Sequence, residues 1–207
     1  MEFFLSAIVT VFIVVDPIAL APIFIGLTTR MTEEQRRHVA LRSVMVAAGI
    51  MIVFAAVGRP LLAALGISLN AFYIAGGALL FLIAIDMLFA RPSRTRETPE
   101  EAAEGRTAAD ISVFPLAIPI MSGPGSMATI VLFMSQAGDN VLRIGSVALA
   151  LAIALTASYV VMCLSGPLMA VLRRTGIAVV GRVMGVILAA LAAQFVINGV
   201  TAVLHLR

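Results

Sequence analysis

An acidic side chain within an apolar stretch is the first feature of this sequence that could do chemistry. Asp16 stands inside residues 3–28, which are otherwise almost wholly apolar, and Pro17 follows it directly. Aspartate is a favoured helix N-cap and proline a favoured first helical residue, so the pair predicts the start of a second half-helix. A carboxyl group deep in a membrane is costly unless it is paired, solvated or protonated. This favours a role for Asp16 in coupling to a proton or a cation; a purely structural cap is the alternative, and the two roles are compatible.

A second interruption falls in residues 112–136, where Gly123-Pro124-Gly125 divides an apolar stretch near its centre. Proline removes a helix hydrogen-bond donor and glycine adds backbone freedom, so an unbroken helix is not expected. Opened backbone in hydrocarbon survives only where protein or water satisfies it. The stretch therefore predicts a buried site near the membrane midplane, with a helix kinked only for packing as the alternative.

A half-helix that begins near Pro124 would direct free amides towards this midplane site, and such amides suit an anionic group. Hydroxyl groups on the same half-helix could add contacts, and carbonyls released by the prolines could hold an ammonium group or a cation. A small zwitterion would satisfy both ends. The predicted substrate-binding residues are Asp16, Pro17, Pro22, Pro119, Ser122, Gly123, Pro124, Gly125, Ser126 and Thr129. Asn70 and Gln194 are assigned to a pathway, although an interhelical hydrogen bond is the commoner use of such a glutamine.

Composition assigns the chain to the polytopic membrane proteins, whose partner is the lipid bilayer. Hydrophobic residues are 61% and charged residues 12% of the chain, against roughly 25% charged residues in a soluble domain. The 14 basic residues are all arginines, without the interleaved aromatics of a nucleic-acid surface, so no nucleic-acid partner is expected. Cys163 is the one cysteine and lies in an apolar stretch, so no metal site and no cofactor are predicted.

Six apolar stretches are long enough to cross a bilayer, which takes about 20 residues. A charged stretch at 90–111 is predicted to be a cytoplasmic linker between residues 1–89 and 112–207, the two halves of a single transmembrane domain, 1–207. The fold predicted is therefore all-α, with these spans: 3–28, 39–58, 68–89, 112–136, 143–165 and 178–203.

Two pairs of matching segments indicate that the halves are repeats. Residues 58–63 resemble residues 165–170, and residues 74–79 resemble residues 183–188 at a nearly constant offset. Chance similarity between glycine-rich apolar helices is the alternative. Because each half has three spans, the repeats would be inverted in the membrane, with the interrupted first and fourth helices meeting at the midplane.

Arginines predict the orientation of the chain. Three connections that share one side carry most of them, and the positive-inside rule places those connections in the cytoplasm, with both termini outside. The arginines of these connections are Arg30, Arg36, Arg37, Arg42, Arg91, Arg94, Arg96, Arg106, Arg173 and Arg174.

Three segments together resemble the MarC family of bacterial inner-membrane proteins: VDPIALAPIFIGLT at 15–28, FPLAIPIMSGPGSMATIVL at 114–132 and RVMGVILAALAAQFVINGV at 182–200. The resemblance runs the whole length. It implies a six-span protein of the bacterial inner membrane, in a family linked by name to multiple antibiotic resistance, some of whose members are described as transporters of small neutral amino acids. The family pattern covers Asp16-Pro17, Pro22, Pro115, Pro119 and Gly123-Pro124-Gly125, whereas Asn70 and Ser126 rest on reasoning from the residues alone.

We predict a secondary transporter of a small neutral solute, with an amino acid as the favoured class, that works by alternating access and is coupled to a proton or sodium gradient. A non-transporting scaffold or stress-related membrane protein is the alternative. No enzyme is expected, because His38 and His205 are the only histidines, and no HExxH motif or nucleotide-binding loop is present. A homo-oligomer is left open.

Overall fold

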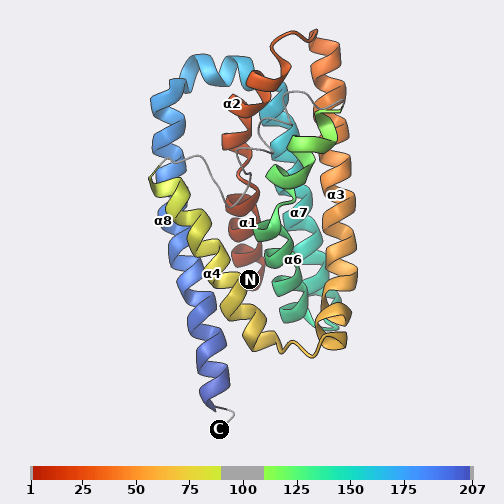
Figure 1. Ribbon diagram of the computed structural model, residues 1–207, viewed down its shortest axis with the longest axis vertical. Helices are drawn as coiled ribbons and strands as arrows, with labels where there is room; N and C mark the ends of the chain where they lie inside the picture. Colours follow the sequence, from red (N-terminus) through yellow and green to blue (C-terminus); the bar gives the residue numbers. More distant parts are fainter. Residues whose placement is uncertain (1, 90–109, 206–207) are drawn as a thin grey trace.

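The computed structural model describes residues 2–89 and 110–205, and within these ranges the chain is helical and contains no strand. Figure 1 shows an elongated bundle in which the interrupted helices α1 and α2 run through the middle. The predicted linker lies outside the described residues, apart from its last two positions. The helical segments are α1 (Glu2–Val15), α2 (Pro17–Thr28), α3 (Glu33–Ala64), α4 (Leu69–Leu88), η1 (Ser112–Met121), α6 (Pro124–Ala137), α7 (Val141–Cys163) and α8 (Ser165–His205).

Length and apolar composition identify the membrane-spanning helices. Among the described residues five stretches qualify, with Glu2–Thr28 counted as one, and the bent pair formed by η1 and α6 brings the number to six. The predicted all-α membrane protein is confirmed, and six spans agree with the structure when the bent pair is one crossing. Both chain ends lie towards the lower end of the bundle in Figure 1.

Side-chain caps place the helix starts earlier than hydropathy does. Thr32 and Gln35 form a capping box, in which each side chain accepts the other residue's backbone amide, at 3.3 and 2.9 Å. The helix α3 therefore begins before the predicted span 39–58, and it also continues past Pro60 to Ala64. The predicted boundaries were too short because the first turns of α3 are polar and carry no hydropathy signal.

The last helix also exceeds its predicted span, 178–203. It begins at Ser165, and its first part crosses the top of the bundle before the chain turns downwards next to α4 (Figure 1). The segment Thr175–Leu204 is the part that is long and apolar enough to cross a membrane.

Helices α4 and α8 pack closely and run antiparallel. A Cβ atom added to Gly77 would lie 2.8 Å from the carbonyl oxygen of Ala192, and one added to Gly199 would lie 2.9 Å from that of Asn70. Small residues let helix backbones approach this closely in membrane proteins. The pairing fixes the last helix of each half against the other.

The start of η1 is attached to α3 through Asp110, which precedes the first residue of η1. Asp110 accepts hydrogen bonds from the amide and hydroxyl of Ser112 and forms a salt bridge of 2.8 Å with Arg42. These hydrogen bonds, with the nearby guanidinium, hold the pKa of the Asp110 carboxyl below its usual value. The contact fixes where the second half enters the bundle.

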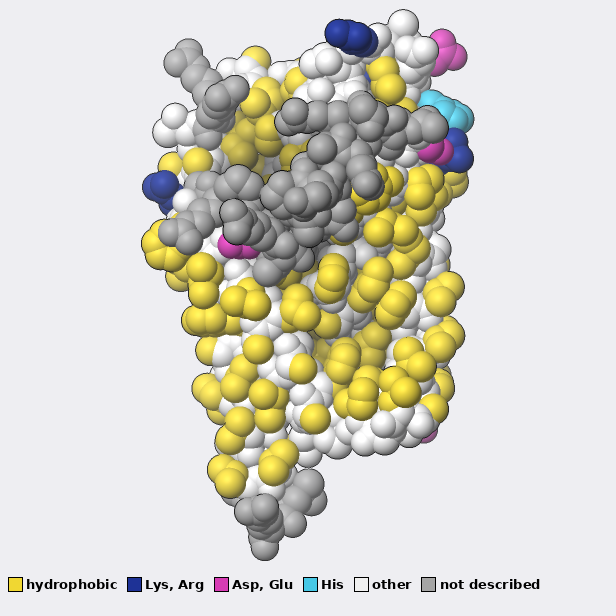
Figure 2. All heavy atoms as spheres, viewed as in Figure 1, with side chains coloured by type: hydrophobic (Ala, Val, Ile, Leu, Met, Phe, Trp, Pro, Cys, Tyr) yellow, Lys and Arg dark blue, Asp and Glu magenta, His cyan; other side chains and the backbone are white. Residues whose placement is uncertain are grey.

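Hydrophobic side chains cover the middle of the face shown in Figure 2, and charged side chains gather mainly near its upper end. This is the distribution expected of a protein embedded in a bilayer.

The orientation predicted from the arginines can be tested with reporter fusions. A periplasmic reporter fused after Arg207 should be active, because 10 arginines lie in the three connections of the opposite side. The same reporter fused after Met31, in the connection between α2 and α3, should be inactive. The reverse pattern of activity would show that the chain is inserted the other way round.

Candidate functional site

The first break lies between α1 and α2, at Asp16. This residue adopts the left-handed conformation, with φ 51° and ψ 65°, which aspartate tolerates better than most residues. Its carboxylate accepts the amide of Ala19 at 3.4 Å, and its own amide donates to the carbonyl of Phe12 at 3.0 Å. Asp16 is therefore the N-cap of α2, as its sequence predicts, and its side chain is only 7% exposed.

The prolines around this break act differently. Pro17 is the first residue of α2 and is buried, where its missing amide costs the helix nothing. Pro22 lies inside α2, which continues past it to Thr28. The interruption is therefore confined to Asp16.

The second break lies between η1 and α6, whose axes differ by 56°. Within η1, the backbone is not helical at Phe114 and Ile118, each of which precedes a proline, as expected for residues in that position. The amide and hydroxyl of Ser122 both donate to the carbonyl of Ala117, at 2.9 and 2.8 Å. The end of η1 is thus closed by Ser122, a predicted site residue.

Only glycine fits at position 123, because the backbone of Pro119 lies too close for a side chain. The φ of −70° at Gly123 suits any residue, but a Cβ atom here would lie 2.4 Å from the carbonyl oxygen of Pro119. As the N-cap of α6 it offers no side-chain oxygen to the first amides of that helix. Pro124 follows as the first helical residue and is exposed, whereas Gly125 is buried. The start of α6 therefore has no side-chain cap inside the bundle.

The two breaks lie next to each other. A Cβ atom on Gly125, in the first turn of α6, would lie 3.7 Å from Cγ1 of Val14, in the last turn of α1. Further down the same two helices, the rings of Phe3 and Phe133 are in edge-to-face contact at 5.7 Å. The helices are therefore antiparallel, so the carbonyl end of α1 lies next to the amide end of α6. These ends carry opposite partial charges.

Two residues in the first half of α6 carry buried hydroxyl groups. Ser126 and Thr129 are 4% and 1% exposed, and the Thr129 hydroxyl donates to the carbonyl of Gly125 at 2.8 Å. Of the predicted binding residues, Pro22 lies inside α2, Ser126 and Thr129 lie along α6, and the others lie at or next to the two breaks; all but Pro22 and Pro124 are buried. Asn70 and Gln194 lie elsewhere. Asn70 is about three turns or more from Leu80 and Ile83, the α4 residues that face Gly125. Gln194 is exposed on α8.

Thr10 is a polar residue of this region that the sequence analysis did not select. Its hydroxyl is fully buried and has no hydrogen-bond partner in the part of the chain that the structure describes. Phe3, Thr10 and Val14 are seven and four residues apart and share one face of α1, so Thr10 faces α6 between Gly125 and Phe133. No local sequence pattern marks this residue, because its surroundings depend on how α1 packs against α6.

An apolar hollow lies away from both breaks. It measures about 380 Å³ and lies between α3, α6 and α7, with Ile52, Met134 and Leu151 among its wholly apolar lining. Across residues 2–89 and 110–205, no three histidine, cysteine or acidic side chains come together in a way that could hold a metal ion.

These features define an all-helical, multi-pass membrane protein with two opposed helix breaks. Residues 1–204 match the family model described as "MarC family integral membrane protein", and the chain belongs to that family, as its motifs indicated. Its relatives include a "UPF0056 membrane protein" of Archaeoglobus fulgidus, 34% identical over 96% of this chain and 92% of the relative.

Two Escherichia coli proteins are also similar. "UPF0056 membrane protein YhcE" is 30% identical over 91% of this chain and 87% of its own length. "UPF0056 inner membrane protein YhgN" is 30% identical over 95% of each chain. No solved structure matches the chain.

Proposed function

We propose that the protein is a secondary transporter of a small neutral solute, with an amino acid as the favoured class. The observation that carries this proposal is the meeting of the two breaks, where the last turn of α1 lies against the uncapped first turn of α6. The amide end of α6 suits a carboxylate, and the carbonyl end of α1 with Asp16 suits an ammonium group or a cation. A zwitterion has both groups.

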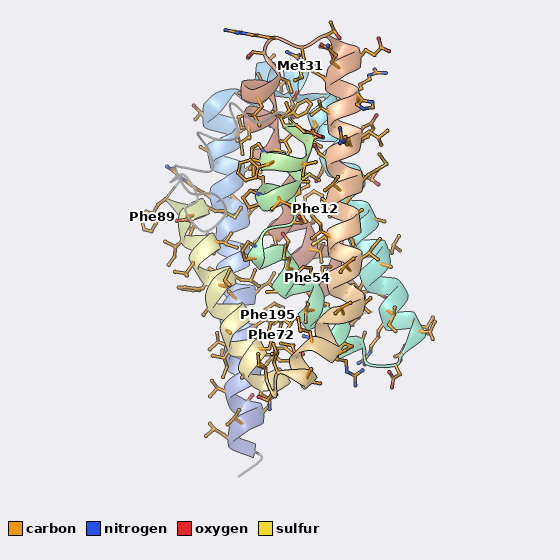
Figure 3. The ribbon with its side chains drawn as sticks, turned by 45° about the vertical axis from the view of Figure 1, so that its right-hand side comes forward. Phe12, Met31, Phe54, Phe72, Phe89 and Phe195 are labelled. Atoms are coloured by element: carbon orange, nitrogen blue, oxygen red, sulfur yellow. The ribbon has the colours of Figure 1, made fainter. Side chains whose placement is uncertain are left out.

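Two inverted repeats would give such a site its alternating access. The packing supports this arrangement, because α1 and α2 pack against α7 of the second half, and η1 and α6 pack against α3 of the first. The pairs α1 with α6 and α4 with α8 are each antiparallel. Exchanging the halves converts the contacts of α1 and α2 with α7 into those of η1 and α6 with α3, as expected for inverted repeats. Phe12, in the last turn of α1, lies about half-way along the bundle (Figure 3), which suits a site at the membrane midplane.

In this conformation the polar residues at the breaks are buried. Asp16, Ser122 and Thr129 are 7%, 0% and 1% exposed. Transport therefore requires that one half move against the other to open the breaks to each side in turn. The same closed, largely apolar packing is what favours the second candidate, a membrane scaffold without transport activity.

We further infer that the protein lies in the inner membrane and is not an enzyme. The inner membrane is the location in the name of the relative YhgN. Against enzymatic activity, the hydroxyls of Ser122 and Thr129 at the second break donate to backbone carbonyls and not to a catalytic base.

Uptake into liposomes tests the transport proposal directly. Purified protein reconstituted with a panel of labelled neutral amino acids should accumulate at least one of them when a proton or sodium gradient is applied. Empty liposomes and protein without a gradient are the controls. If no amino acid or other small neutral solute in the panel moves under either gradient, the scaffold interpretation takes its place.

Replacing Thr10 by valine separates stability from transport. Valine has nearly the same shape and removes a buried hydroxyl without a described partner, so thermal stability should rise by about 1 kcal/mol. If the hydroxyl contacts the solute or its water when the breaks open, uptake should fall several-fold in the same variant. Thr28→Val is the control, since that buried hydroxyl donates to Phe24 at 2.7 Å, and it should leave uptake intact. Normal uptake by the Thr10 variant would limit this residue to packing.

A further inference from the structure

Helix α8 carries two lines of residues with the alternating three- and four-residue spacing of helix-packing seams. The first is buried against α4 and the core, and Figure 3 shows its Phe195 turned into the bundle. This buried seam consists of Gly185, Leu188, Ala192, Phe195 and Gly199. The second line lies about a third of a turn round the helix and is exposed apart from a half-buried leucine. This amide seam consists of Ile187, Leu191, Gln194, Asn198 and Thr201.

The amide seam has a hydrogen-bonding capacity that its own helix only partly uses. The Gln194 side-chain amide donates to Oδ1 of Asn198 at 2.8 Å, and the Thr201 hydroxyl donates to the carbonyl of Ile197 at 2.8 Å. The Gln194 carbonyl and the Asn198 NH₂ group find no partner in residues 2–89 and 110–205. One residue thus presents an acceptor outwards and its neighbour presents donors.

These amides lie at the depth of the membrane-spanning helices. The packing of Gly77 on Ala192, and of Gly199 on Asn70, brackets Gln194 and Asn198 between two levels of α4. The helix α4 begins at Leu69 and has 20 residues, a length of about 30 Å that matches the hydrocarbon thickness of a bilayer. Lipid chains at that depth offer no hydrogen bonds. An exposed amide pair there is costly unless a protein partner covers it.

We propose that the amide seam is the contact between two copies of this chain, with α8 of each packed in parallel against α8 of the other. Copies inserted in the same orientation are related by a two-fold axis along the membrane normal, which brings equal depths together. Gln194 and Asn198 of one copy then meet the same residues of the partner, and the Gln194 carbonyl of each copy can accept from the Asn198 NH₂ group of the other, one turn along the pair. Ile187 and Leu191 continue the contact as packed apolar residues, and amides at such positions fix the register of the pair. This inference does not depend on transport.

Disulfide cross-linking in liposomes tests the proposal. Cys163 is the only cysteine, so a Cys163→Ala background accepts single new cysteines. In that background Thr201→Cys should form a covalent dimer on mild oxidation. Val200→Cys, at the same depth but a quarter-turn away and 40% exposed, is the matched control and should cross-link far less. Equal cross-linking at both positions, or none at Thr201→Cys, overturns the proposal.

The role of the amides is measured by energy transfer between labelled copies at increasing lipid dilution. Gln194→Leu with Asn198→Leu should shift the monomer–dimer equilibrium roughly tenfold towards monomer, because interhelical amide hydrogen bonds are lost. Leucine favours membrane insertion, so the variant should be made normally. Gln194→Asn, which keeps an amide, should lie closer to the unaltered chain. A doubly substituted chain that dimerises as well as the unaltered one would refute the role of the seam.

Discussion

Asp16→Asn should fold and insert normally but lose gradient-driven accumulation of the solute. Asparagine keeps the capping oxygen that accepts the amide of Ala19, and it is the other residue that tolerates the left-handed conformation at this position. Folding should therefore change by less than about 1 kcal/mol. Coupling needs a group that can change its charge or hold a cation, and an amide does neither. Exchange of solute down its own gradient should persist.

Two further variants isolate the cause of that loss. Asp16→Ala removes both the cap and the tolerance for positive φ, so it should destabilise the protein by about 1–2 kcal/mol. Asp139→Asn removes an exposed carboxylate that lies 3.6 Å from Arg59, and it should change neither stability nor uptake. Undiminished concentrative uptake by Asp16→Asn would leave Asp16 as a helix cap alone.

The two breaks could be located from sequence because their causes are local. Asp16-Pro17 combines a capping side chain with a residue that prefers the first helical position, and the structure begins α2 there. Gly123-Pro124 likewise gives the start of α6. A proline alone did not locate a break reliably. Pro22 was expected to contribute to the interruption, but α2 continues past it.

The features that the sequence did not reveal are those that depend on neighbouring helices. Thr10 matters only because the antiparallel register of α1 and α6 directs it towards the second break, and a register between distant segments leaves no local pattern. The sequence also did not reveal that Gln194 is exposed, since a glutamine in an apolar helix could face either the interior or the lipid. Its orientation was settled by the glycines that bring α8 against α4. Boundaries of α3 and α8 were missed because hydropathy does not register polar or surface-lying turns.

The meeting of the breaks connects the fold to the proposed mechanism. Asp16 and Ser122 each close one helix end from within their own span, and each broken span packs against the second span of the other half. The pairing of α4 with α8 is more extensive than that of α1 with α6, so in the proposed mechanism we expect a movement of the halves to change the contact between α1 and α6 first.

Gly123→Ala should damage both stability and transport, and it should do so through one contact. The added Cβ atom would meet the carbonyl oxygen of Pro119 at 2.4 Å, and since that oxygen belongs to the backbone it cannot rotate away. The end of η1 and the start of α6 must then move apart, and overpacking of this kind costs about 1–3 kcal/mol. Because φ is −70° here, alanine meets no conformational strain, and the loss reports the close contact alone.

Thermal unfolding in detergent, followed by the reaction of Cys163 with a thiol-reactive dye, gives the change in stability. Gly49→Ala is the matched control, because nothing lies within 4 Å of its added Cβ atom and the site is inside α3. That variant should be unchanged or more stable by about 0.5–1 kcal/mol. Uptake should fall more than tenfold in the Gly123 variant, because its α6 amides are displaced from the end of α1, and should stay normal in the control. If Gly123→Ala is as stable and active as Gly49→Ala, the second break is not held by this contact and its amides are not part of the site.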